Sequence, residues 1–197
     1  FSNFISYSVY EDTKSLVNEV CLDASRGKIT VQGGDNAQDI WESYYNHIPH
    51  EERHDFIKAY YKRLTHENAD TRLSAAKVWS KWEAATSRLI IDSDAIDDFD
   101  DPTFALQFAR IECHYFINNA FFKTDNWLIE NVDKIKHIPC TIIQGRYDVV
   151  CPARSAWDLH RAWPESTLKI IPDAGHSAGE VGIRSALIEA TENFKKF

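Results

Sequence analysis

Two stretches near the end of the chain decide its fold: CTIIQGRYDVVCP at residues 140–152 and STLKIIPDAGHSAG at residues 166–179. Each begins with a short apolar run and ends in a turn, which is typical of a buried β-strand followed by a loop. The sequence also predicts helices at 153–163 and 183–197, so strands and helices alternate. Such alternation is typical of an α/β fold with parallel strands.

Both predicted loops carry a side chain suited to acid–base chemistry. Asp148 follows the first strand and His176 follows the second. In open α/β sheets, sites form beyond the carboxyl ends of the strands, and the chain order Asp then His is that of α/β-hydrolases. A carboxylate can orient an imidazole that acts as a general base. The alternative is that Asp148 caps a turn and His176 is a polar loop residue, and spacing alone does not separate the two.

The chain before these strands has a helical pattern. Residues 69–90 carry apolar side chains at helical spacing, and residues 51–64 have acids in the first turn and bases in the last, as the helix dipole favours. We also predict helices at 39–48 and 103–120. The acid-rich stretch that begins at Asp92 lacks the ligand spacing and central glycine of a calcium loop, and we interpret it as a solvated loop.

The predicted sheet is incomplete. Two parallel strands do not make a stable sheet alone, so we expect further strands upstream. Met is absent from all 197 residues, including the first. Both observations indicate a piece of a longer protein. Residues 1–35 give only a weak strand-then-loop signal, and we assign them to no domain.

Composition argues against several classes of function. The net charge of −8 and the pI of about 5.5 disfavour nucleic acid as a partner, because phosphate binding needs clustered Lys and Arg. No apolar run approaches the roughly 18 residues that a membrane span needs, and no signal peptide opens the chain. The four cysteines have no zinc-binding spacing. We therefore expect a cytoplasmic protein with reduced thiols and no metal.

Several blocks of the sequence, taken in order, resemble the proline iminopeptidase family. They are DIWESYYNHIP (39–49), AAKVWSKWEAAT (75–86), FALQFARIECHYFINNAFF (104–122), GRYDVVCP (145–152), SAWDLHRAWP (155–164) and DAGHSA (173–178). The resemblance runs from about residue 39 to the C-terminus. Ordered blocks at compatible spacing are more specific than any single motif.

This resemblance implies a C-terminal fragment of an α/β-hydrolase. Residues 36–134 would form an all-helical cap domain, and residues 135–197 would form the last part of the core, with its two last parallel strands. The implied activity is that of a serine-type aminopeptidase, which releases N-terminal proline from peptides through an acyl-enzyme and uses no cofactor. In such an enzyme Asp148 and His176 would be the triad acid and base.

The resemblance also implies that two cap acids, Glu83 and Glu112, bind the cationic imino group of the substrate. A pair of carboxylates gives charge-assisted hydrogen bonds to such a group. Without the resemblance, Glu83 reads as a helix-surface acid, whereas Glu112 lies among apolar residues and needs a partner or a function. Trp79 and Trp82 either line the proline pocket or belong to the core. We interpret Cys151 as a small buried thiol.

Residues 175–179, GHSAG, match the G-x-S-x-G pattern of a hydrolase nucleophile. We do not assign Ser177 that role, because the acid and base of such an enzyme come later in the chain, and no His follows Gly179. The sequence therefore predicts an acid and a base without a nucleophile. We expect the isolated chain to be inactive.

Two alternatives stay open. Instead of an aminopeptidase, the chain could belong to another α/β-hydrolase, such as an esterase or amidase. It could also be a non-catalytic truncated product. An esterase has no use for a pair of acids that binds a cation, so Glu83 and Glu112 separate these functions. The sequence determines neither the oligomeric state nor any substrate preference beyond N-terminal proline.

Overall fold

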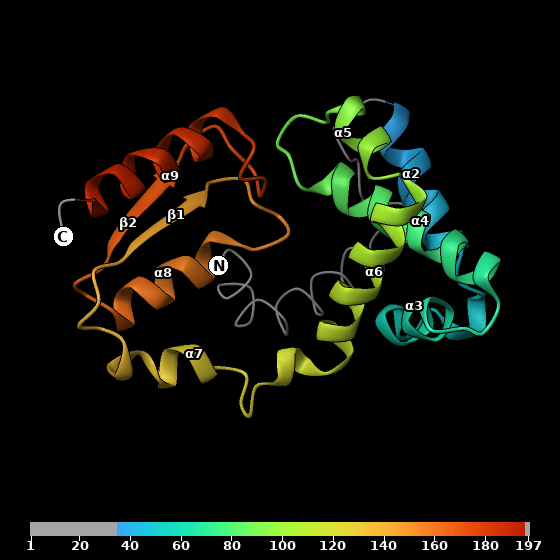
Figure 1. Cartoon of the computed structure of the whole chain (residues 1–197), viewed down its shortest axis with the longest axis horizontal. Coiled ribbons are helices and arrows are strands. Elements are labelled where there is room, and N and C mark those ends of the chain that lie inside the picture. The colour runs from blue at the N-terminus through green and yellow to red at the C-terminus, as the bar shows by residue number, and fades with distance from the viewer. Residues whose placement is uncertain (1–34, 196–197) are drawn as a thin grey trace. The chain divides into compact units, whose positions relative to one another are not determined.

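A computed structural model describes residues 35–195 as two compact units (Figure 1). The helical unit comprises residues 35–86 and Ile90–Phe121, and the α/β unit comprises Ser87–Leu89 and 122–195. The weakly predicted segment 1–35 lies outside the described residues except for its last residue.

The helical unit contains the four predicted helices, together with three shorter helices that the sequence did not predict. The predicted helices are α2 (Asp35–Asn46), α3 (Phe56–Leu64), α4 (Ala69–Thr86) and α6 (Pro102–Ile117), and the shorter ones are η2 (His50–Glu52), α5 (Ser93–Asp98) and η3 (Asn119–Phe121). Capping side chains define several of the starts. Asp55 accepts a hydrogen bond from Lys58 N at 3.0 Å, and Asp101 accepts from Thr103 N and Phe104 N just ahead of α6.

Aromatic side chains and alanines build the core of this unit. Tyr44 and Tyr60 stack at 4.7 Å between ring centroids, and the Trp79 ring meets Tyr60 edge-on at 5.2 Å. α4 packs against α6, and Ala76 and Ala105, both fully buried, leave room for the two helices to approach closely. Trp79 is therefore a core residue, 3% exposed.

The acid-rich stretch is helical, so the prediction of a loop there was wrong. Asp92 caps α5 by accepting from Ala95 N at 3.2 Å, and Ile96 is buried against Ala84 and Ala85. The cap and the burial of Ile96, with Ile91 and Phe99 packed against the same cluster, stabilise this short helix. Asp94, Asp97 and Asp98 of α5 are exposed to solvent.

The α/β unit has the predicted alternation. Its elements are α7 (Trp127–Glu130), η4 (Val132–Lys134), β1 (Thr141–Gly145), α8 (Ala153–Ala162), β2 (Thr167–Ile171) and α9 (Val181–Phe194). β1 and β2 pair in parallel, with Thr141 opposite Thr167 and Gly145 opposite Ile171. α8 and α9 lie on opposite sides of the strands (Figure 1). This arrangement confirms the α/β prediction, since parallel strands need helices on both faces.

None of the helices within residues 35–195 is both long and apolar enough to cross a membrane.

The turn after α6 has an unusual backbone. Asn119, Ala120 and Phe121 have φ values of 51°, 50° and 63°, so three consecutive residues with side chains adopt the left-handed conformation. This conformation costs roughly 1–2 kcal/mol for a residue that carries a Cβ. The chain passes from the helical unit to the α/β unit immediately after this turn.

We expect Ala120→Gly to raise the free energy of unfolding by about 0.5–1 kcal/mol, because glycine adopts positive φ without the Cβ clash. Urea denaturation of the full chain measures it. Ala95→Gly, inside α5, is the matched control and should lower the free energy of unfolding by a similar amount. Destabilisation by both changes would contradict the left-handed turn.

Candidate active site

Asp148 lies in the loop that follows β1 and is held by three donors. Its Oδ1 accepts from Val150 N at 3.0 Å and from Cys151 N at 2.7 Å, and its Oδ2 accepts from Gln144 Nε2 at 3.1 Å. The side chain is only 6% exposed. A buried carboxylate needs such donors, because burial without them would be costly. The donors fix the carboxylate in one orientation.

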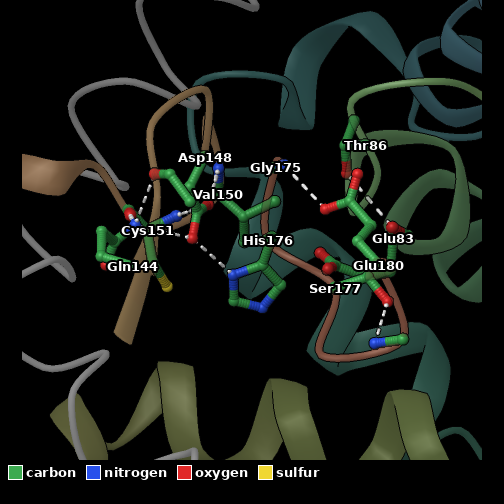
Figure 2. A network of polar contacts seen from close by, with 12 residues as sticks. Glu83, Thr86, Gln144, Asp148, Val150, Cys151, Gly175, His176, Ser177 and Glu180 are labelled. Atoms are coloured by element: carbon green, nitrogen blue, oxygen red, sulfur yellow. Dashed lines mark hydrogen bonds and ion pairs between the residues drawn. The ribbon is translucent and has the colours of Figure 1, made fainter. Parts of the chain in front are cut away.

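His176 lies in the loop that follows β2, and its ring is directed toward Asp148 (Figure 2). His176 Nδ1 is 3.0 Å from Asp148 Oδ2. The carboxylate can only accept, so Nδ1 is the donor, and in the neutral ring Nε2 is the nitrogen with a free lone pair. The ring thus has the tautomer that a general base needs.

Backbone contacts bring the two loops together. Arg146 N donates to Ile171 O at 2.9 Å, and Tyr147 N donates to Ala174 O at 3.0 Å. A Cβ added to Gly145, the residue before Arg146, would lie 1.8 Å from Gly175 O. Only glycine fits at position 145, because the backbone of the histidine loop occupies the space of a side chain.

Opposing influences act on the pKa of His176. Burial lowers the pKa, whereas hydrogen bonds with Asp148 and the Cys151 thiol, together with the negative charge nearby, raise it. The raising influences prevail, so the pKa of His176 lies above its ordinary value of 6.5. The ring is 39% exposed, and solvent therefore screens part of this attraction.

Ser177 has a turn-forming role in the same loop. Its Oγ accepts from Gly179 N at 3.2 Å, and its backbone N–H donates to Ser87 O at 2.7 Å. Within the part of the chain that the structure describes, no hydrogen bond joins Ser177 Oγ to a histidine ring. The geometry gives no support to Ser177 as a nucleophile.

Glu83 and Glu112 belong to the helical unit. Glu112, on α6, accepts from Trp79 Nε1 on α4 at 2.7 Å. Glu83 lies one helical turn after Trp79 on the same face of α4. Both acids are half-buried, which is unusual for a helix-surface Glu. That they share one cavity with Asp148 and His176 stays a prediction.

Cys113, next to Glu112, is not a nucleophile at neutral pH. Burial raises the pKa of its thiol to about 12, and the charges of Glu112 and Asp55 act in the same direction. Among the described residues, no group of His, Cys, Asp and Glu side chains has the arrangement of a metal site.

Several supporting residues were not predicted from the sequence. Gln144 donates to Asp148 and also to Cys151 O at 2.9 Å, and it is buried in the middle of an apolar strand. The polar Gln144 inside the apolar run TIIQG could have indicated a supporting role, because a buried side-chain amide needs hydrogen-bond partners. Ser87 and Glu180, which hold the histidine loop from the other side, carried no local signal.

The chain is similar to known proteins over about four-fifths of its length. No protein-family model matches the chain. It is 60% identical over 156 residues to a probable proline iminopeptidase of Leptolyngbya boryana, covering 79% of this chain and 49% of that protein. It is 50% identical over 158 residues to a proline iminopeptidase of Arabidopsis thaliana, covering 80% of this chain and 42% of that protein.

The chain belongs to the proline iminopeptidase family. This confirms the resemblance found in the sequence. The family is an α/β-hydrolase family, so β1, β2 and their helices correspond to the C-terminal part of a hydrolase core. The chain spans about half the length of the curated proline iminopeptidases it matches.

We expect the histidine–aspartate pair to make stability depend on pH. A pKa that is raised in the folded state contributes stability that is fully present below about pH 6.5 and is lost as the pH rises through the raised value. The free energy of unfolding of the native chain should therefore exceed that of His176→Ala most at low pH, and the difference should shrink at high pH. Urea denaturation across a pH series measures it.

His137→Ala, which removes an exposed histidine of the same unit, is the control and should leave the pH profile unchanged. A difference between native chain and His176→Ala that grows with pH would contradict the pairing.

Gly145→Ala tests the close approach of the two loops. The added Cβ would meet backbone that cannot move without separating the loops, so we expect a loss of about 1–3 kcal/mol or more in the free energy of unfolding. Gly179→Ala is the control, because the nearest atom to its Cβ is the mobile end of the Arg88 side chain, at 3.2 Å. Equal effects of both substitutions in urea denaturation would contradict the packing.

Proposed function

We propose that this chain supplies the acid and the base of a serine-type aminopeptidase that releases N-terminal proline from peptides. The observation that carries the proposal is the 3.0 Å contact between Asp148 Oδ2 and His176 Nδ1, made by residues at successive strand ends in the hydrolase order. The names of the relatives support the substrate, since they are proline iminopeptidases.

In the proposed reaction, His176 Nε2 takes the proton of a serine hydroxyl. The serine oxygen attacks the carbonyl carbon of the N-terminal proline, and His176 then returns the proton to the leaving amine as the C–N bond breaks. Water deacylates the enzyme by the same route in reverse, releasing proline. Asp148 stabilises the imidazolium that forms in each step. We propose that the attacking serine is not part of this sequence; the turn that Ser177 forms at the G-x-S-x-G match supports this.

Glu83 and Glu112 are proposed to bind the cationic imino group of the substrate. Two carboxylates provide charge-assisted hydrogen bonds that a neutral acyl group cannot use. The bond from Trp79 Nε1 holds the carboxylate of Glu112 in a defined orientation. This pair makes the proposal specific for a free N-terminus rather than for any ester or amide.

A chimaera tests the proposal. The matched 156 residues of this chain replace their counterparts in the proline iminopeptidase relative of Leptolyngbya boryana, which supplies the remainder. We expect release of the arylamine from a prolyl arylamide, with loss of at least about 10³-fold in kcat for Asp148→Asn or His176→Ala. The isolated chain should release none and is the negative control.

Glu83→Gln and Glu112→Gln in the chimaera test the specificity. Each should lower kcat/KM for the prolyl arylamide by about 10- to 100-fold, because a charge-assisted hydrogen bond is lost, and should leave hydrolysis of a neutral ester nearly unchanged. Glu67→Gln, an exposed acid of the same unit, is the control. Equal losses on both substrates would favour an esterase or amidase, and turnover by the isolated chain that disappears in Ser177→Ala would overturn the assignment of the nucleophile.

A further inference from the structure

Glu180 uses both of its carboxylate oxygens to join two segments that are far apart in the sequence. Its Oε2 accepts from Gly175 N at 2.7 Å (Figure 2). Its Oε1 accepts from Leu89 N at 2.9 Å. Gly175 immediately precedes His176, whereas Leu89 lies in the segment Ser87–Leu89, which belongs to the same unit. Glu180 therefore connects the histidine loop to that segment.

The carboxylate of Glu180 makes no hydrogen bond that caps its own helix, α9. Glu180 is the N-cap residue of α9, a position at which a short polar side chain commonly accepts from the first helical N–H groups. Its side chain makes no such capping bond. Both of its carboxylate oxygens instead accept from backbone N–H groups outside α9.

The histidine loop is held at three successive amides. Gly175 N donates to Glu180, while His176 N and Ser177 N both donate to Ser87 O, at 2.9 Å and 2.7 Å. The two anchors belong to one assembly, because Glu180 also holds Leu89 N, two residues after Ser87. The backbone on both sides of His176 is thereby fixed.

The packing at Gly175 makes this assembly tight. A Cβ added to Gly175 would lie 2.8 Å from Leu89 N, so the two backbones are in direct contact. On the other side, Ala174 O accepts from Tyr147 N of the loop that carries Asp148. The histidine loop therefore lies between the aspartate loop and the segment Ser87–Leu89. Glu180 bonds to both the histidine loop and that segment.

We propose that Glu180 is a positioning residue for His176: by holding Gly175 N and Leu89 N with one carboxylate, it keeps the imidazole at hydrogen-bonding distance from Asp148. The role of His176 as a general base rests on the proposed function. The positioning role of Glu180 concerns only the geometry of the histidine loop. Loss of the carboxylate frees the peptide that precedes His176, and the ring then leaves Asp148 for part of the time.

NMR of the isotopically labelled full chain tests this role. In Glu180→Gln the side-chain amide can accept only through its oxygen, so one of the two bonds is lost; Glu180→Ala loses both, and Glu180→Asp keeps the charge. We expect the amide hydrogens of Gly175 and Leu89 to exchange about tenfold faster in Glu180→Gln and Glu180→Ala. The pKa of His176, followed by its ring nitrogen shifts, should fall toward the ordinary value of imidazole, and Glu180→Asp should restore part of both effects.

Glu192→Gln is the matched control, because it removes an exposed acid of α9 that pairs with Lys195, and it should change neither readout. Faster amide exchange with an unchanged pKa and unchanged ring shifts of His176 would overturn the positioning role and leave Glu180 as a loop anchor only. Unchanged exchange at Gly175 would also overturn it. If Glu180→Ala does not fold, Glu180→Gln carries the test.

These readouts do not require turnover, so failure of the proposed proline release and failure of the positioning role give different results. In the active chimaera, Glu180→Gln should lower kcat for the prolyl arylamide with little change in KM, since Glu180 does not touch the substrate. A change confined to KM would contradict positioning of the base.

Discussion

The contact between Gly145 and the backbone of Gly175 is the constraint on which the candidate site depends. A Cβ at position 145 would lie 1.8 Å from Gly175 O, so the loops after β1 and β2 touch without an intervening side chain. The parallel register places Gly145 opposite Ile171, and the two loops therefore leave the strands at the same level. A shift of the register would carry His176 away from Asp148, because side chains alternate between faces along a strand.

Electrostatics explains why the site needs several supporting residues. Asp148 is 6% exposed, and its charge is stabilised by two backbone N–H groups and by Gln144. The carboxylate in turn raises the pKa of His176 against the effect of burial. Glu180 makes the same kind of interaction, because its carboxylate accepts from a backbone N–H of the histidine loop. Both loops are thus organised by acids that accept from main-chain amides.

Most of the fold followed from local patterns. The helices at α3, α4 and α6 and the strands β1 and β2 lie where periodicity, caps and turns predicted them. The acid-rich stretch was misread because the charges on its exposed side outweigh, in the sequence, the single buried Ile96 that holds α5 in place. The left-handed turn at Ala120 could not be predicted either, since residues with a Cβ rarely adopt that conformation.

The sequence by itself determined the order of strands and helices, the positions of Asp148 and His176 at strand ends, and the family to which the chain belongs. Only the tertiary structure decided which residues hold that pair in place. The bond between Leu89 N and Glu180 joins residues 91 positions apart, and the two bonds at Ser87 O are similarly long-range. Local patterns record the preferences of neighbouring residues, whereas such a clamp exists only after the chain has folded and brought distant backbone groups within hydrogen-bonding distance.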